Sequence, residues 1–376
     1  MSVNPVPTLS DLARQQSTRR EFLIRSSILG ALAPLSLSAC SDETGERAER
    51  KTSTPGGAPP QVGPATAVPN ANSSLDTGGH ANLHQSTAGA AGQAKNLAFR
   101  RYNPELPPVS QERNLKLQFT AQEVPLKVAD DVTISAWTFD GDIPGPVVHV
   151  RQGDTVEFTL VNHGSLPHSM DFHAAQIDPK IAFRSANPGQ PVSFTFRAKF
   201  PGVYMYHCGT SPVLMHIGSG MVGAIVVDPP APLPAAKEFV LVQSEYYLGA
   251  AVGGVLPFDY TKMLATLPDY VVFNGRPGQY MGAPISVKVG DRVRFYVVNA
   301  GPTHPCNFHV VGEQFDTVYL GSPPAMPIRG VQTFAVAPGG GLIFEMLADV
   351  PGEFVFVNHG FGHGQKGAIG ILSVQA

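Results

Sequence analysis

Short runs of alternating apolar and polar residues follow one another from about residue 96 to the end of the chain. In the run VEFTLV at 156–161, apolar side chains stand at every second position, which is the pattern of a strand with one buried face. Gly, Pro and Asp residues separate the runs, as expected for tight turns. The pattern predicts an all-β protein rather than one built on long helices.

Four short motifs of the first half of the chain recur in the second half in the same order. They are VRQGDTVEF and VKVGDRVRF at 150–158 and 287–295, HSMDFH and HPCNFH at 168–173 and 304–309, Pro-Gly before His207 and before His359, and Gly-Ala-Ile at 223–225 and 367–369. This ordered set predicts two tandem Greek-key β-sandwich domains. The proline-rich segment 229–236 is the natural link, so we expect domain one at 96–229 and domain two at 230–376.

The N-terminal segment has the features of an export signal. Residues 18–23 (TRREFL) have the twin-arginine pattern, an apolar stretch spans 28–37, and the stretch ends in a lipobox-like sequence at Cys40. Residues 1–40 therefore predict a Tat-type signal, with Cys40 as a lipid anchor or, alternatively, with cleavage further along. Either way we expect a periplasmic or cell-envelope protein, and its one possible attachment to a membrane is a lipid anchor at Cys40.

Composition narrows the remaining possibilities. Residues 41–95 are rich in Ala, Gly, Ser, Thr and Pro, so we expect a flexible tether there. The net charge of −3 and the lack of a basic stripe argue against nucleic acid as a partner. The 376 residues include only three cysteines, Cys40, Cys208 and Cys306. An exported protein without an evident disulfide pair is expected to use its cysteines for metal binding or in the core.

One ordered set of residues in the first domain has the chemistry of a copper site. His168, Cys208, His216 and Met221 combine two imidazoles, a thiolate and a thioether, the ligands of a blue, or type 1, copper centre. A Cys at a strand end, a short loop bearing His and a Met that opens the next strand can converge on one ion. Taken singly, Cys208 and Met221 would fit a protein core equally well, but the ordered set favours copper.

The second domain lacks this set. Gly360 stands where the repeat would place the cysteine ligand. We therefore expect His304, the repeat partner of His168, to be a structural polar residue and Cys306 to be a small buried one.

Strand alternation predicts a second metal site. Neighbouring residues of a strand point to opposite faces, so His207 should point away from the centre that Cys208 serves. The same reasoning places Asp171 and His173 together on that opposite face, and the repeat supplies His309 and His359 from domain two. If the two faces meet, four histidines and a carboxylate gather in one place. Three histidines and an open position make a catalytic metal site, which leaves a His and an Asp for acid–base chemistry.

The motifs together resemble the copper-containing nitrite reductases over about residues 96 to 376. The resemblance rests on 167–175 (PHSMDFHAA), the loop from Cys208 to Met221, 270–275 (YVVFNG) and 308–312 (FHVVG). The length of the Cys208 loop is similar to that of the branch that includes lipid-anchored outer-membrane members. The resemblance implies two cupredoxin-like domains.

The resemblance also implies a role for each site residue. The type 1 copper would be held by His168, Cys208, His216 and Met221, the type 2 copper by His173, His207 and His359, proton transfer would fall to Asp171 and His309, and Val311 would lie over the substrate. About two coppers per chain follow. In this family the type 2 site lies between the subunits of a homotrimer, whereas the repeat alone leaves open which chain supplies His359.

The implied activity is the one-electron reduction of nitrite to nitric oxide and water, as in denitrification. The electron would come from a soluble periplasmic donor, a small copper protein or a cytochrome c, and would pass from type 1 to type 2 copper through Cys208 and His207. Two alternatives compete. A laccase-like multicopper oxidase reducing dioxygen needs paired His-x-His motifs, of which the sequence has none. A non-catalytic copper electron carrier would leave the second set of histidines without a purpose.

Overall fold

The computed structural model of the protein describes residues 98–321 and 327–376. The predicted signal at 1–40, its Cys40 and the predicted tether at 41–95 lie outside the described residues. Within these residues strands predominate and the helices are short, so the prediction of an all-β fold is confirmed. No helix of the described part is long and apolar enough to cross a membrane.

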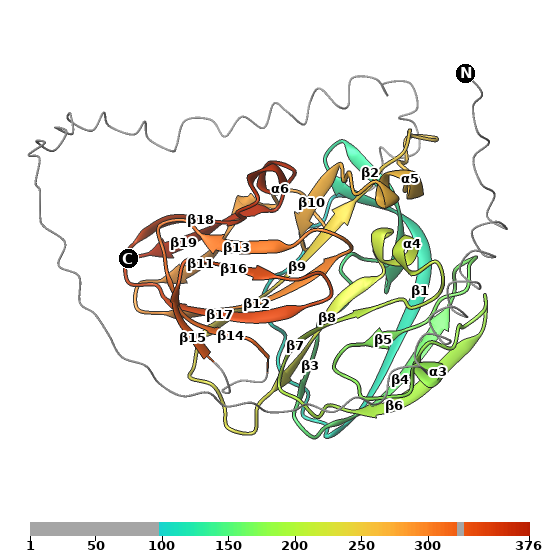
Figure 1. The fold of residues 1–376 in the computed structure, drawn as a ribbon, viewed down its shortest axis with the longest axis horizontal. Helices are drawn as coiled ribbons and strands as arrows, with labels where there is room; N and C mark the ends of the chain where they lie inside the picture. Colours follow the sequence, from blue (N-terminus) through green and yellow to red (C-terminus); the bar gives the residue numbers. More distant parts are fainter. Residues whose placement is uncertain (1–97, 322–326) are drawn as a thin grey trace, which may run out of the picture. The chain divides into compact units, whose positions relative to one another are not determined.

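The first β-sandwich is built from two four-stranded sheets (Figure 1). One sheet has the order β2-β1-β4-β6 and the other β3-β8-β7-β5. Their bounds are β1 Asn114–Ala129, β2 Val132–Phe139, β3 Val148–Arg151, β4 Thr155–Asn162, β5 Asp171–Phe172, β6 Pro191–Arg197, β7 Gly202–His207 and β8 Val222–Asp228. Two short helices interrupt them, α3 at Pro179–Ala182 and α4 at Val213–Gly218. Phenylalanines of β1, β4 and β6 pack against β7 and β8 to form the core.

The second sandwich repeats this plan with a six-stranded and a five-stranded sheet, ordered β10-β9-β12-β17-β14-β15 and β11-β19-β18-β13-β16. Its strands are β9 Lys237–Tyr246, β10 Tyr270–Phe273, β11 Tyr280–Lys288, β12 Arg292–Gly301, β13 Cys306–Val310, β14 Phe315–Tyr319, β15 Pro327–Val331, β16 Thr333–Val336, β17 Gly341–Leu347, β18 Gly352–Asn358 and β19 Ile369–Gln375. The helices are α5 at Tyr260–Leu264 and α6 at Phe361–Gln365. The parallel pair β1–β4 recurs as β9–β12, and β3–β8 recurs as β11–β19. The strand pairing thus carries the same duplication as the sequence.

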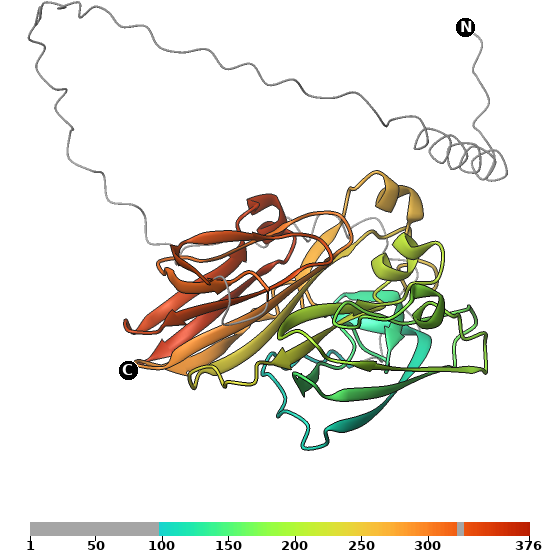
Figure 2. The same ribbon diagram turned by 60° about the horizontal axis from the view of Figure 1, so that its bottom comes forward.

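A third hydrophobic cluster joins the two sandwiches, which lie side by side in Figure 2. Strand β8 sends Ile225 and Val227 into the first core, and Ala224 and Val226 into the joining cluster. Because β8 is buried on both faces, it reads as a continuous apolar run rather than an alternating one. The contact is close: a Cβ atom added at Gly341 of β17 would lie 2.2 Å from the carbonyl oxygen of Val203 in β7.

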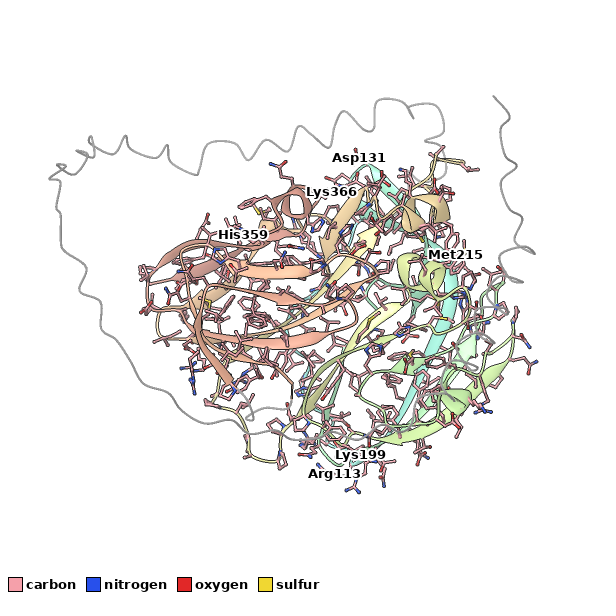
Figure 3. All side chains as sticks on the ribbon, viewed as in Figure 1. Arg113, Asp131, Lys199, Met215, His359 and Lys366 are labelled. Atoms are coloured by element: carbon pink, nitrogen blue, oxygen red, sulfur yellow. The ribbon has the colours of Figure 1, made fainter. Side chains whose placement is uncertain are left out.

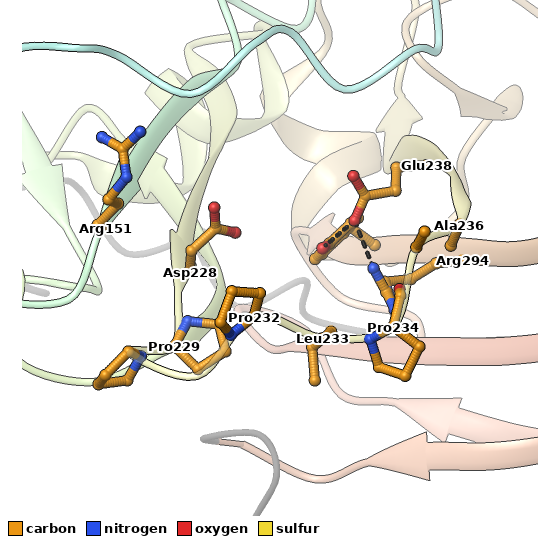
Figure 4. Close-up of a pocket in the computed structure, with 12 residues that line it drawn as sticks. Arg151, Asp228, Pro229, Pro232, Leu233, Pro234, Ala236, Glu238 and Arg294 are labelled. Atoms are coloured by element: carbon orange, nitrogen blue, oxygen red, sulfur yellow. Dashed lines mark hydrogen bonds and ion pairs between the residues drawn. The ribbon is translucent and has the colours of Figure 1, made fainter.

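A cavity of about 450 Å³ lies where the chain passes from the first sandwich to the second (Figure 4). The proline-rich link lines one side, and Arg294 pairs with Glu238 at 2.6 Å on the other. Glu238 also accepts a hydrogen bond from the hydroxyl of Tyr296 at 2.8 Å. The residues that line this cavity include no histidine or cysteine, so its chemistry is separate from that of the metal centres.

Candidate metal centres

The first centre gathers three side chains from three separate segments. Cys208 directly follows β7, His216 lies in α4, and His168 lies just before β5. The Cys208 sulfur lies 3.2 Å from Nδ1 of His216 and 4.0 Å from Nδ1 of His168, and the two Nδ1 atoms are 3.3 Å apart. All three side chains are buried. One thiolate and two imidazole nitrogens therefore converge on a point that one metal ion can occupy.

Backbone hydrogen bonds bring Met221 to the same place. The amide of Cys208 donates to the carbonyl of Met221 at 3.1 Å, and the amide of Met221 donates to the carbonyl of His216 at 3.1 Å. Met221 is fully buried and packs in the core of the first sandwich with Cys208. The short loop between Cys208 and Met221 thus folds back so that its two ends lie side by side.

The surroundings of this centre suit a metal held by neutral imidazoles and a thiolate. The amide of Ser169 donates a hydrogen bond to the Cys208 sulfur at 3.3 Å. Burial lowers the pKa of His168, and burial followed by the neighbouring His168 lowers the pKa of His216 to about 4. Both rings therefore stay neutral and can act as ligands at physiological pH. Burial raises the pKa of the Cys208 thiol, so its thiolate would require a bound metal.

The second centre lies on the other side of β7. Asp171 of β5 is the register partner of His207 in β7, and His173 follows two residues later. The Nε2 atoms of His207 and His173 are 3.1 Å apart. A carboxylate oxygen of Asp171 lies 3.4 Å from the first and 3.8 Å from the second. The three groups form a compact cluster of candidate metal ligands, separate from the first one.

Each histidine of the second centre is oriented by a backbone carbonyl. Nδ1 of His173 lies 2.9 Å from the carbonyl oxygen of Gly339, and Nδ1 of His207 lies 2.9 Å from that of Cys208. If each Nδ1 carries the proton and donates it, each Nε2 presents its lone pair to the space that they share. Burial, and then the neighbouring His207, lower the pKa of His173. These observations fit a metal bound by Nε2 of both rings.

The described part of one chain does not bring the histidines of domain two to this cluster. His309 and His359 lie together, with ring centres 5.1 Å apart, on β13 and just after β18. Figure 3 shows His359 beside β13 and β18, and among the described residues the second cluster of candidate ligands consists of Asp171, His173 and His207. The expected meeting of four histidines and a carboxylate is therefore not found within a single chain.

His309 stands at the edge of a cavity of about 320 Å³. Its Nδ1 atom lies 2.7 Å from the carbonyl oxygen of Gln332. The cavity is lined by His309, Gly312, Glu313, Gln314 and Gln332. Val311, predicted to lie over the substrate, is 45% exposed and is not among the residues that line this cavity.

The remaining residues of the second domain behave as sequence reasoning suggested. Cys306 is fully buried in the core of the second sandwich. The ring of His304 packs on that of His363 with centres 4.7 Å apart, and its Nε2 atom lies 3.0 Å from the carbonyl oxygen of Thr266.

Sequence reasoning missed the groups that hold the histidines in place. They are the carbonyls of Gly339 and Gln332 and the carboxylate of Glu123, which lies 2.8 Å from Nε2 of His168. Carbonyl groups leave no residue-type signal, and Glu123 is 45 positions from its partner in the sequence. A glutamate on a long strand gives no hint of such a contact.

Comparison with known proteins identifies the class first. Two family models described as multicopper oxidase match residues 120–232 and 256–375. A solved structure of a multicopper oxidase is 27% identical and superimposes with a TM-score of 0.62, covering 69% of this chain and 88% of that one. Fold and sites together therefore define a cupredoxin-type copper protein of the multicopper oxidase class.

More specific likenesses narrow the class to one family. The chain is 41% identical over 290 residues to the copper-containing nitrite reductase of Neisseria meningitidis serogroup A, covering 74% of this chain and 75% of the relative. The solved copper nitrite reductase from Nitrosomonas europaea is 37% identical, with a TM-score of 0.64, and the match covers 70% of this chain and 94% of that one. The chain belongs to the family of copper-containing nitrite reductases.

Proposed function

We propose that this protein reduces nitrite to nitric oxide and water, taking up one electron and two protons per nitrite. The observation that carries the proposal is the adjacency of Cys208 and His207, which place two separate candidate metal centres on the two sides of one strand end. A site that receives single electrons and a site that binds a small oxyanion are thereby linked by one peptide bond.

Copper would supply single-electron exchange at the first centre and a Lewis-acidic position for a nitrite oxygen at the second. The first copper would be held by His168, Cys208, His216 and Met221. His173 and His207 would bind the second through Nε2. Each imidazole keeps its remaining N–H on a carbonyl, which fixes the ring before any ligand arrives.

Asp171 is placed to handle a proton at the second centre. Asp171 is the first residue of β5, and its carboxylate lies 3.4 Å from Nε2 of His207 and 3.8 Å from Nε2 of His173. In its protonated form this carboxyl group can donate its proton to the nitrite oxygen that leaves as water, and the carboxylate that remains is reprotonated from solvent. His309, held on the carbonyl of Gln332, is the proposed second proton donor.

An anaerobic assay tests the activity directly. Copper-loaded protein is mixed with nitrite and a reduced artificial donor, and nitric oxide is followed with an electrode. We expect nitric oxide from the wild type and none from Cys208→Ala, which should also lose its thiolate-to-copper absorption. No nitric oxide from the wild type, together with consumption of dioxygen in a parallel aerobic assay, would favour the multicopper oxidase alternative and overturn the proposal.

We further propose a homotrimer in which His359 of one copy completes the second centre of its neighbour. His359 is exposed and packs on the exposed ring of Phe361 with centres 4.7 Å apart. The cluster around His207 holds two imidazoles within the described part of one chain. A third imidazole supplied across a symmetric interface would make the three-histidine site that catalysis requires. A monomer by light scattering that binds two coppers would contradict this proposal.

The soluble donor is proposed to dock over the first centre, where apolar side chains surround the buried ligands. Leu166, Phe183 and Val213 are exposed, and a Cβ atom at Gly209 would lie 3.2 Å from the Phe183 ring. Such a rim excludes water around a redox site without requiring tight binding. Phe183→Asp should raise KM for a small copper protein or cytochrome c donor and leave turnover with a small-molecule donor unchanged.

The cellular location is also a proposal. Arg19 and Arg20 in the twin-arginine pattern, and Cys40 after the apolar stretch, lead us to place the protein in the periplasm or on the cell envelope as a lipoprotein. Replacing both arginines by lysine should retain the precursor in the cytoplasm. Cys40→Ser should release the exported protein from the membrane fraction, and equal membrane retention would exclude lipidation.

A further inference from the structure

The carboxylate of Glu123, a residue of β1, lies against the ring nitrogen of His168 that points away from the first centre. Its Oε1 atom lies 2.8 Å from Nε2 of His168, while Nδ1 of the same ring faces Cys208 and His216. His168 is fully buried, and the Glu123 side chain is 20% exposed. If copper takes Nδ1, the single proton of the neutral ring must sit on Nε2, where it donates to the carboxylate.

The chain is shaped to hold this carboxylate. Oε2 of Glu123 accepts a hydrogen bond from the amide of Ser165 at 2.7 Å, and Oε1 receives a longer one from the amide of Leu166 at 3.4 Å. A Cβ atom added at Gly164 would lie 2.5 Å from Oε1. Only glycine leaves the carboxylate room to reach the ring. The hydrogen bond to His168 therefore depends on two residues, Glu123 and Gly164, that lie far apart in the sequence.

We infer that Glu123 is a positioning residue of the first centre, which fixes the orientation of His168 and lowers the reduction potential of the copper bound there. A carboxylate hydrogen-bonded to a ligating imidazole makes the ring a stronger electron donor and fixes its tautomer. Negative charge beside the site also favours Cu(II) over Cu(I). This inference rests on copper occupying the first centre, as the proposed function requires.

Glu123→Gln tests the charge while keeping the shape. The blue absorption should persist, and the Cu(I)/Cu(II) ratio at a fixed applied potential should rise about tenfold, a shift of about 59 mV for one electron. Glu157→Gln, on the exposed face of β4, is the control and should leave the potential unchanged. Equal potentials for wild type and Glu123→Gln would overturn the inference, whereas a wild type without blue absorption would overturn the copper site itself.

Gly164→Ala provides a second test. This variant keeps the Glu123 carboxylate but pushes it away from the His168 ring. We expect the same direction of shift as in Glu123→Gln. In a Glu123→Ala background there is no carboxylate to displace, so adding Gly164→Ala should change the potential no further. Additive shifts in the reduction potential from the two positions would show that Gly164 acts through something other than Glu123. That result would contradict the proposal that Gly164 makes room for the Glu123 carboxylate.

Discussion

Two neighbouring residues, His207 and Cys208, belong to different candidate metal centres, because the end of a strand alternates its side chains between two faces. The thiolate turns into the core of the first sandwich, and the imidazole turns toward Asp171 and His173. Nδ1 of His207 lies 2.9 Å from the Cys208 carbonyl oxygen, so with its proton on Nδ1 the ring is held against the backbone of the neighbouring residue. The shortest covalent route between the two centres is therefore also a rigid one.

The buried imidazoles make the copper-free protein sensitive to acid. Burial lowers the pKa of His168 and lowers that of His216 to about 4, whereas an unfolded histidine titrates near 6.5. Between these values the unfolded chain binds more protons, so the free energy of unfolding falls as the pH falls from about 6.5 towards 4. For His216 alone the loss is on the order of 3 kcal/mol.

Urea unfolding of copper-free protein at pH 7.5 and 4.5 measures this effect. The free energy of unfolding should be lower at pH 4.5, and the drop should be smaller in His216→Gln, which cannot take up the proton. If wild type and variant show the same drop, His216 does not contribute to the acid sensitivity.

Removing either proposed proton donor should separate copper binding from turnover. Asp171→Asn and His309→Ala leave the neutral imidazole ligands in place, so each variant should keep both coppers. Nitrite reduction should fall on the order of 10²–10⁴-fold, the usual contribution of a general acid or base.

Copper content and nitric oxide formation between about pH 5.5 and 7, around the reference pKa of histidine, are the measurements. Asp130→Asn, in the exposed turn after β1, is the matched control and should behave as wild type. Near wild-type turnover in Asp171→Asn or His309→Ala would remove that residue from the mechanism.

At the scale of strands and loops, the sequence predicts much of the two-sandwich fold. Alternation and the four repeated motifs predict the tandem sandwiches, because half-buried strands and an ordered duplication each leave a regular signal. The pairing of Asp171 with His207 follows from the same alternation. The contact of Glu123 with His168 could not be predicted from the sequence, because a long-range side-chain contact produces no periodic pattern. The separation of His359 from His173 could not be predicted either, because it depends on how whole sheets pack.

The contact between β7 and β17 gives a prediction at this scale. A methyl group at Gly341 would overlap the Val203 carbonyl at 2.2 Å, so Gly341→Ala should push the two sandwiches apart. We expect a loss of about 1–3 kcal/mol in the free energy of unfolding, as for other overpacked sites. Denaturant titration of the copper-free protein is the measurement.

Gly362→Ala provides the comparison, because Gly362 lies in α6 with nothing within 4 Å of an added Cβ. That variant should be as stable as wild type or slightly more so, since alanine favours a helix. Equal stability of Gly341→Ala and wild type would mean that β17 can shift without cost.

At the scale of the whole molecule, the described part of the chain holds two groups of histidines apart from one another. His173 and His207 lie on the first sandwich with Asp171, and His309 and His359 lie on the second. A closed ring of identical chains brings unlike surfaces of successive copies together at every interface. Such an arrangement would unite the two groups as many times as there are chains.

Subunit mixing distinguishes a shared site from one within a chain. His173→Ala and His359→Ala should each be inactive alone, because each lacks a ligand at every second centre.

When both variants are co-expressed, some interfaces are intact. In these, the His359→Ala chain supplies His173 and the His173→Ala chain supplies His359. Random assembly into rings gives about a quarter of all interfaces this composition, so about a quarter of the wild-type nitrite turnover per chain should return. The His173→Ala/His359→Ala double variant, co-expressed with Cys208→Ala, controls for rescue by assembly alone. It should restore no turnover, because every complete second centre then lies on a Cys208→Ala chain, which cannot receive electrons. No recovery in co-purified mixed trimers would place all second-centre ligands within one chain.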